Sequence, residues 1–229
     1  MANVLIIGAS RGIGRELVRQ YLADGARVLA SARKDDDLVN LSELGAEPIP
    51  LDVSAANDWA GLGWKLDGEQ LDIAIYAAGV YGPSTSGLEA PADADFDAVM
   101  HTNVQGAMRF AQTVAPMLVA EGTRRQGGRL AVISSRMGAM AGRSESRGWL
   151  YRASKAALNS VLVDTALSLG PRGAICITMH PGWVRTDMGG AGADLSVEQS
   201  AAGIRGVIAG LTPAHNGAFL NFDGSPIPW

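Results

Sequence analysis

Short apolar runs alternate with longer segments of helical periodicity along the chain, and this alternation constrains the fold more than any other feature. The runs are rich in Val, Ile and Leu. Strands that crossover helices bury on both faces have this composition, whereas strands with one face in water alternate apolar and polar residues. The sequence therefore predicts an α/β fold in which a doubly wound parallel sheet is flanked by helices.

Seven strands and six helices are expected from this pattern. The predicted strands are residues 4–7, 27–31, 47–51, 73–77, 129–133, 174–179 and 218–222. The predicted helices are residues 13–23, 35–44, 57–66, 93–120, 150–169 and 197–209. The helical segment 93–120 is expected to be either two helices or one bent helix, because Pro116 lacks a backbone donor and crowds the preceding turn. Ligands of such a sheet bind outside the carboxyl ends of the strands, where the strand order reverses.

Length, charge and composition narrow the class of protein. A chain of 229 residues with 47% hydrophobic content is expected to form one α/β domain over residues 1–229. The formal net charge of −4 argues against nucleic acid or an anionic membrane surface as a partner. The first residues have no basic region before a short apolar run, so a soluble, cytoplasmic protein is expected. Cys176 is expected to be a small buried hydrophobe, and no histidine has a partner at metal-ligand spacing, so no metal site is expected.

The first predicted strand leads into a glycine-rich segment, Gly8-Ala9-Ser10-Arg11-Gly12-Ile13-Gly14, and then into an amphipathic helix. Glycines let the backbone turn tightly and approach a pyrophosphate, and the free N–H groups at the helix N-terminus stabilise the anion. The spacing of these three glycines differs from the Gly-x-Gly-x-x-Gly fingerprint that is common in dinucleotide-binding proteins. Taken alone, the segment is also compatible with an ordinary turn between a strand and a helix. The candidate cofactor contacts in it are Gly8, Ser10, Arg11, Gly12, Ile13 and Gly14.

A second motif, Tyr151-Arg152-Ala153-Ser154-Lys155, lies at the start of the predicted helix 150–169. Residues four apart share one face of a helix, so Tyr151 and Lys155 are expected to lie side by side. A phenol with a pKa near 10 is a poor base at neutral pH, but an adjacent ammonium group lowers that pKa. The pair therefore predicts that Tyr151 acts as a general acid or base. Because Tyr-x-x-x-Lys also occurs by chance, the prediction depends on the glycine-rich segment upstream.

The order and spacing of the motifs resemble the short-chain dehydrogenase/reductase family, whose members have a Rossmann fold. Further segments that carry this resemblance follow the fourth, fifth and sixth predicted strands: Tyr76-Ala77-Ala78-Gly79, Ser134-Ser135-Arg136-Met137-Gly138, and residues 180–188. The likeness extends from Val4 to Trp229. Within the family, residues 151–159, 181–190 and 223–229 resemble the C-factor/sniffer-like carbonyl reductases, a group that includes proteins described as signals.

The resemblance implies four catalytic residues. Tyr151 would exchange a proton with the substrate oxygen, and Ser135 would donate a hydrogen bond to that oxygen. Tyr151 and Lys155 would also contact the cofactor, Lys155 at the nicotinamide ribose. Ser134 remains an alternative to Ser135, because both lie at the end of a strand and alternation directs only one of them toward the site. Asn103 matches a helix asparagine whose backbone carbonyl positions a water in the family. The other interpretation of Asn103 is an ordinary residue on a helix surface.

The resemblance also implies a nicotinamide cofactor. An acidic residue after the second strand binds the ribose hydroxyls of NAD in this family, but this chain has Ser31-Ala32-Arg33 there. Arg33 and Arg11 supply guanidinium groups suited to a phosphate, so NADP(H) is favoured over NAD(H). Ala77 replaces the family's Asn, so the hydrogen bonds of that side chain must be lost or replaced. The remaining implied contacts are Asp52 and Val53 at the adenine, Ala78 and Gly79 at a ribose, and Pro181, Gly182, Val184 and Thr186 at the nicotinamide carboxamide.

The leading hypothesis for function is an NADP(H)-dependent oxidoreductase that transfers a hydride between the nicotinamide and a small carbonyl or alcohol substrate. The alternative is a cofactor-binding regulatory or signalling protein whose reductase turnover is incidental. A sugar-nucleotide epimerase also fits Tyr-x-x-x-Lys, but such enzymes generally have a larger region after the lysine. Homo-oligomers, either dimers or tetramers, are common in the family.

Overall fold

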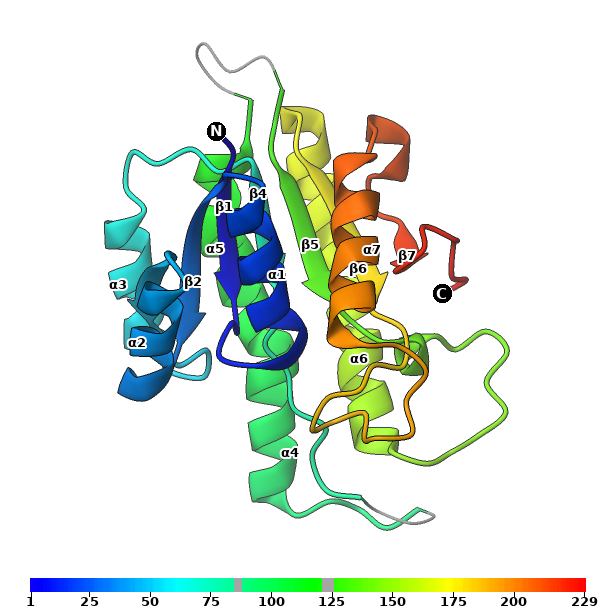
Figure 1. Cartoon of the computed structure of the whole chain (residues 1–229). Coiled ribbons are helices and arrows are strands. Elements are labelled where there is room, and N and C mark those ends of the chain that lie inside the picture. The colour runs from blue at the N-terminus through cyan, green and yellow to red at the C-terminus, as the bar shows by residue number, and fades with distance from the viewer. Residues whose placement is uncertain (85–87, 121–125) are drawn as a thin grey trace.

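The computed structural model describes residues 1–84, 88–120 and 126–229. Its centre is one seven-stranded parallel sheet with the order β3-β2-β1-β4-β5-β6-β7 (Figure 1). The predicted doubly wound fold is therefore confirmed. The strands are β1 (Asn3–Ile7), β2 (Arg27–Ala32), β3 (Glu47–Pro50), β4 (Ile73–Tyr76), β5 (Arg129–Ile133), β6 (Ile175–His180) and β7 (Phe219–Asn221).

Helices cover both faces of the sheet (Figure 1). One face is covered by α1 (Gly12–Ala23), α2 (Asp35–Glu43) and α7 (Val197–Ala209). The other face is covered by α3 (Ala56–Lys65), α5 (Gly106–Leu118) and α6 (Trp149–Leu169), while α4 (Asp93–Met100) extends beyond the carboxyl edge of the sheet. Within the described residues, no helix has both the length and the apolar composition that crossing a membrane requires.

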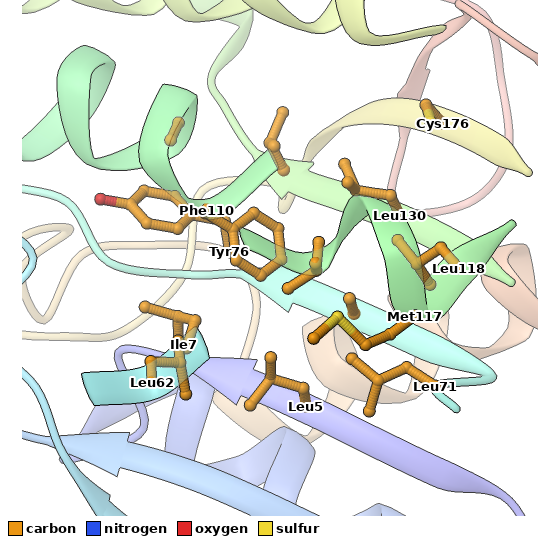
Figure 2. Packing of buried hydrophobic residues seen from close by; sticks show 14 of the residues in the cluster. Leu5, Ile7, Leu62, Leu71, Tyr76, Phe110, Met117, Leu118, Leu130 and Cys176 are labelled. Atoms are coloured by element: carbon orange, nitrogen blue, oxygen red, sulfur yellow. The ribbon is translucent and has the colours of Figure 1, made fainter. Parts of the chain in front are cut away.

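The side chains of β1 show how the sheet supports two cores. Leu5 and Ile7 point into the core under α3, α5 and α6, whereas Val4 and Ile6 point into the core under α1, α2 and α7. All four side chains are fully buried, and each contributes about 1.5–3 kcal/mol relative to an exposed position. Figure 2 shows part of the first core, with Leu5, Ile7, Leu62, Leu71, Tyr76, Phe110, Met117, Leu118, Leu130 and Cys176.

Cys176 has the environment that the sequence predicts. Its side chain is fully buried in β6 within the first core (Figure 2). Burial raises the pKa of its thiol to about 12. A thiol with such a pKa stays protonated at neutral pH, so Cys176 packs as a small hydrophobe.

The predicted helical segment 93–120 consists of two helices, but the interruption lies at residues 101–105 and not at Pro116. A π-helical turn, His101–Gln105, joins α4 to α5, and Pro116 lies inside α5 without dividing it. Pro116 removes one hydrogen bond of α5, the one that its own nitrogen would donate to the preceding turn, and α5 ends two residues later at Leu118. The π turn contains Asn103, and such turns are frequent at functional sites.

The strand order reverses between β1 and β4. The segments that follow β1, β4, β5 and β6 leave the sheet at its carboxyl edge, which is the lower edge in Figure 1. This is the place where a doubly wound sheet binds its ligands. The glycine-rich segment and the residues after β4, β5 and β6 are therefore brought to one edge.

Candidate active site

The glycine-rich loop between β1 and α1 has room only for backbone at Gly8 and Gly14. Gly8 has a φ of 88°, and a Cβ on it would lie 2.6 Å from the backbone nitrogen of Ala78. A Cβ on Gly14 would lie 2.1 Å from the carbonyl oxygen of Gly8. The loop and the N-terminus of α1 thus form a cradle in which Gly8 and Gly14 bring backbone segments close together, and such a cradle fits the pyrophosphate of a dinucleotide. Ser10 and Ile13, also predicted as contacts, are half-buried in this segment.

Ser31 holds this loop in place, a role that the sequence analysis missed. The hydroxyl of Ser31 accepts a hydrogen bond from the Gly8 N–H at 3.0 Å, and its carbonyl accepts one from the Ala9 N–H at 2.8 Å. Ser31 is only 1% exposed. A hydroxyl within the apolar part of β2 was the one indication in the sequence, because the contact joins residues 23 positions apart.

The two arginines expected at a cofactor phosphate both have carboxylate neighbours. Arg11 Nη1 lies 2.6 Å from Asp187 Oδ2, and both side chains are 75% exposed. Arg33 Nη1 lies 3.9 Å from Asp52 Oδ2, and its side chain is 68% exposed. Arg33 is therefore paired only loosely, whereas Arg11 forms an ion pair with Asp187. The reason is that the loop after β6 brings the carboxylate of Asp187 to it.

Asp52 and Val53 follow β3, where the resemblance places the adenine. The Asp52 carboxylate accepts hydrogen bonds from the Ser54 hydroxyl at 2.6 Å and the Ser54 N–H at 2.9 Å. The hydroxyl bond is the main reason that the pKa of Asp52 is lowered. Val53 is buried, and its carbonyl accepts a hydrogen bond from the Trp59 indole at 3.0 Å. Asp52 thus stays charged beside Arg33.

The loop after β6 lies against the glycine-rich loop. A Cβ on Gly12 would lie 3.4 Å from Thr186 Cγ2. The Thr186 hydroxyl accepts a hydrogen bond from the Gly189 N–H at 3.1 Å, which holds the loop in a turn. Thr186 therefore lies beside the cradle. The other predicted cofactor contacts of this loop are Pro181, Gly182 and Val184. The Pro181 carbonyl accepts a hydrogen bond from the Ser200 hydroxyl. Gly182 has a positive φ, and Val184 is buried.

Tyr151 and Lys155 lie in the first turns of α6, at the carboxyl edge. Lys155 Nζ is 5.6 Å from the centre of the Tyr151 ring and donates a hydrogen bond to the Ile133 carbonyl at 2.9 Å. Tyr151 is 7% exposed and Lys155 is 3% exposed. Burial lowers the pKa of Lys155 to about 8. The structure thus brings the two side chains together as predicted.

The pKa of Tyr151 changes in the direction opposite to the one expected. Burial raises it to about 12, and a side-chain hydrogen bond with Ser135 opposes this increase. Burial is the largest influence on this pKa, and Lys155 directs its hydrogen bond to the Ile133 carbonyl. In this structure Tyr151 is therefore protonated at neutral pH, which is the form that donates a proton to a carbonyl oxygen.

Strand alternation decides between the two serines after β5. The Ser134 hydroxyl donates to Asn159 Oδ1 on α6 at 2.7 Å, and Ser134 is 2% exposed. Ser135 points the other way: its Oγ accepts a hydrogen bond from the Met137 N–H at 3.1 Å and contacts Tyr151. Ser135 is therefore the serine beside Tyr151, and Ser134 packs the strand against the helix.

Asn103 is fully buried, so its interpretation as a helix-surface residue is wrong. Its side chain accepts a hydrogen bond from the Val80 N–H at 2.9 Å and donates to the Val80 carbonyl at 2.8 Å. It also donates to Ser154 Oγ on α6 at 2.9 Å. A Cβ on Gly79 would lie 3.4 Å from Asn103 Oδ1 and 3.4 Å from Lys155 Nζ. Asn103 thus joins the segment after β4 to the helix that carries Tyr151.

Comparison with known proteins identifies the family. Residues 2–194 match the family model described as short chain dehydrogenase. The chain belongs to the short-chain dehydrogenase family, and the predicted enzyme class, an oxidoreductase of this family, is confirmed. C-signal of Myxococcus xanthus is 38% identical over 165 residues, which are 69% of this chain and 93% of that protein.

Solved structures of carbonyl reductases resemble the whole chain. Carbonyl reductase Sniffer of D. melanogaster has a TM-score of 0.93 at 27% identity, with 100% of both chains covered. A carbonyl reductase from Pseudomonas aeruginosa in complex with NADP has a TM-score of 0.84 at 33% identity, also with 100% of both chains covered. The resemblance to carbonyl reductases inferred from the sequence is therefore confirmed.

Proposed function

We propose that this protein is an NADP(H)-dependent carbonyl reductase in which Tyr151 exchanges a proton with the substrate oxygen. The observation that carries the proposal is the meeting of Ser135, Tyr151 and Lys155 at the carboxyl edge that also holds the glycine cradle. The similarity to carbonyl reductases, one of them in complex with NADP, supports the cofactor and the reaction.

Several parts of the carboxyl edge are suited to hold the cofactor. When bound, NADPH supplies the hydride. The loop from Gly8 to Gly14 would hold the pyrophosphate, and Arg33 would face the phosphate on the adenine ribose. Thr186, beside the cradle, would hold the nicotinamide end. All of these residues lie on segments that follow β1, β2 or β6.

The chain's own residues supply the proton chemistry of the reduction. Tyr151 transfers its phenol proton to the carbonyl oxygen, where negative charge develops. The Ser135 hydroxyl donates a hydrogen bond to the same oxygen. Lys155 then stabilises the phenolate that remains, and its pKa of about 8 lets it exchange protons near neutral pH. In alcohol oxidation the same groups act in reverse.

NADPH consumption in the presence of ketones, aldehydes and quinones tests this proposal. We expect turnover of at least one class of carbonyl compound by the wild-type protein and loss of that turnover in Tyr151→Phe. The second candidate function, a cofactor-binding signalling protein, is favoured by the 38% identity to C-signal. Wild-type and Tyr151→Phe proteins that bind NADPH equally and turn over every substrate equally slowly would support this second candidate.

Arg33→Ala should weaken NADPH binding selectively. Losing a charge-assisted hydrogen bond to phosphate costs about 1.5–3 kcal/mol, which corresponds to a rise of about 10- to 150-fold in the Kd of NADPH. The Kd of NADH should stay nearly constant, because NADH lacks that phosphate. Fluorescence titration with both cofactors measures the effect, and Lys34→Ala controls for the loss of a neighbouring cation. Equal weakening of NADPH and NADH binding would contradict the role of Arg33.

Asp187→Asn should tighten NADPH binding, because it removes the carboxylate that holds Arg11. An exposed ion pair contributes about 0–1 kcal/mol, so the Kd should fall by at most about fivefold. The same substitution in an Arg11→Ala background should have no effect on the Kd. Weaker binding by Asp187→Asn in both backgrounds would show that Asp187 does not compete with the cofactor for Arg11.

A further inference from the structure

Tyr81, a residue that the proposed mechanism does not use, stacks on Tyr151. The ring centroids are 4.7 Å apart and the ring planes differ by 28°. Tyr81 follows β4 and is half-buried. Stacked aromatic pairs of this geometry contribute about 0.5–1.5 kcal/mol beyond the area they bury. Tyr81 thus covers one face of the phenol that the mechanism assigns to proton transfer.

A glycine at the start of α6 makes room for the Tyr81 ring. Gly148 has a φ of 70°, and a Cβ on it would lie 2.4 Å from Tyr81 Oη and 3.1 Å from Tyr81 Cζ. The same Cβ would lie 3.3 Å from Met137 Cε, on the turn after β5. The ring of Tyr81 therefore occupies a slot between the start of α6, the turn after β5 and Tyr151.

Hydrogen bonds of Asn103 fix the backbone beside Tyr81. Both the N–H and the carbonyl of Val80, the preceding residue, are bound by the Asn103 side chain. The third bond of Asn103 reaches Ser154, three residues after Tyr151 on the same helix. One buried side chain thus ties the segment that carries Tyr81 to the helix turn that carries Tyr151.

We propose that Tyr81 is a positioning residue: its ring holds the Tyr151 phenol in its orientation beside Ser135 and keeps water from one face of it. This inference rests on the proposed function of Tyr151 as proton donor. Removing the ring leaves the phenol free to rotate and exposes it to water. Because burial raises the pKa of Tyr151, exposure to water should lower that pKa.

A matched pair of substitutions tests the proposal without turnover. Tyr81→Phe keeps the stacked ring and Tyr81→Leu removes it, while both lack the Tyr81 hydroxyl. The ultraviolet absorbance of tyrosinate during alkaline titration then follows the same remaining tyrosines, and adding Tyr151→Phe to each variant identifies the Tyr151 transition. We expect a Tyr151 pKa near the wild-type value of about 12 in Tyr81→Phe and a pKa closer to about 10 in Tyr81→Leu.

The rate of carbonyl reduction by the same Tyr81 variants is the second measurement that tests the proposal. The kcat of carbonyl reduction should fall about tenfold in Tyr81→Leu, because a misplaced proton donor slows the chemical step. Tyr81→Phe should retain most of the wild-type kcat, and the Kd of NADPH should be the same in both. The alkaline limb of the pH profile should lie at lower pH in Tyr81→Leu, since reduction requires the protonated phenol. Tyr81→Met gives the same comparison if Tyr81→Leu does not fold.

Equal Tyr151 pKa values and equal kcat values in Tyr81→Phe and Tyr81→Leu would overturn the inference. If Tyr151 is not the proton donor, the result is different: the Tyr151→Phe variant keeps the full wild-type activity. Even then the titration decides whether Tyr81 controls the environment of Tyr151, because it requires no catalysis.

Discussion

Tyr151→Phe should lower kcat/KM for carbonyl reduction by about 10²–10⁴-fold, the usual contribution of a positioned proton donor. The substitution removes only the phenol oxygen, so the ring stacked on Tyr81 and its packing at the start of α6 are kept. The Kd of NADPH should therefore change little. Steady-state rates and cofactor titration of the same preparations separate the loss of proton transfer from the loss of binding.

Tyr21 provides a matched control for this experiment. It is 7% exposed, as Tyr151 is, and burial raises its pKa to about 12 as well. Its hydroxyl has no hydrogen-bond partner within the described residues, and it lies on α1 in the core under α7. Tyr21→Phe should keep the wild-type activity. If both variants lose activity equally, the loss results from removing a buried hydroxyl and not from the loss of a proton donor. If Tyr151→Phe keeps full activity, Tyr151 is not the proton donor.

Gly14→Ala should abolish measurable NADPH binding and destabilise the fold. The added Cβ would lie 2.1 Å from the Gly8 carbonyl oxygen and 3.2 Å from Ala9 Cα. These neighbours are backbone atoms, so no side-chain rotation relieves the overlap, and α1 must move away from the loop after β1. Overpacking of this kind costs about 1–3 kcal/mol of unfolding free energy. The same movement opens the cradle that we assign to the pyrophosphate.

Gly61→Ala is the matched control for Gly14→Ala. Gly61 also lies in a helix, α3, but a Cβ on it would have no atom within 4 Å. Alanine is favoured over glycine inside helices by about 0.5–1 kcal/mol, so this variant should be slightly more stable than the wild type. Chemical denaturation and NADPH titration measure both variants. Wild-type NADPH affinity in Gly14→Ala would show that the cofactor does not approach this loop.

The sequence by itself determined the fold and the composition of the site. Strands buried on both faces must be apolar throughout, so β1 and its neighbours are recognisable without knowledge of their partners. A parallel sheet then brings the segments after its strands to one edge. The spacing of Tyr151 and Lys155 likewise needs only the geometry of one helix, and their proximity was predicted correctly.

The tertiary structure alone decided how the side chains of the site are paired and how they ionise. Arg11 meets Asp187, which is 176 positions away, and Asn103 meets Ser154, which is 51 positions away. No local pattern indicates such contacts, because they depend on how whole segments pack. The pKa of Tyr151 rises for the same reason: the spacing to Lys155 predicts a decrease, but the depth at which the phenol is buried follows from every element packed around it.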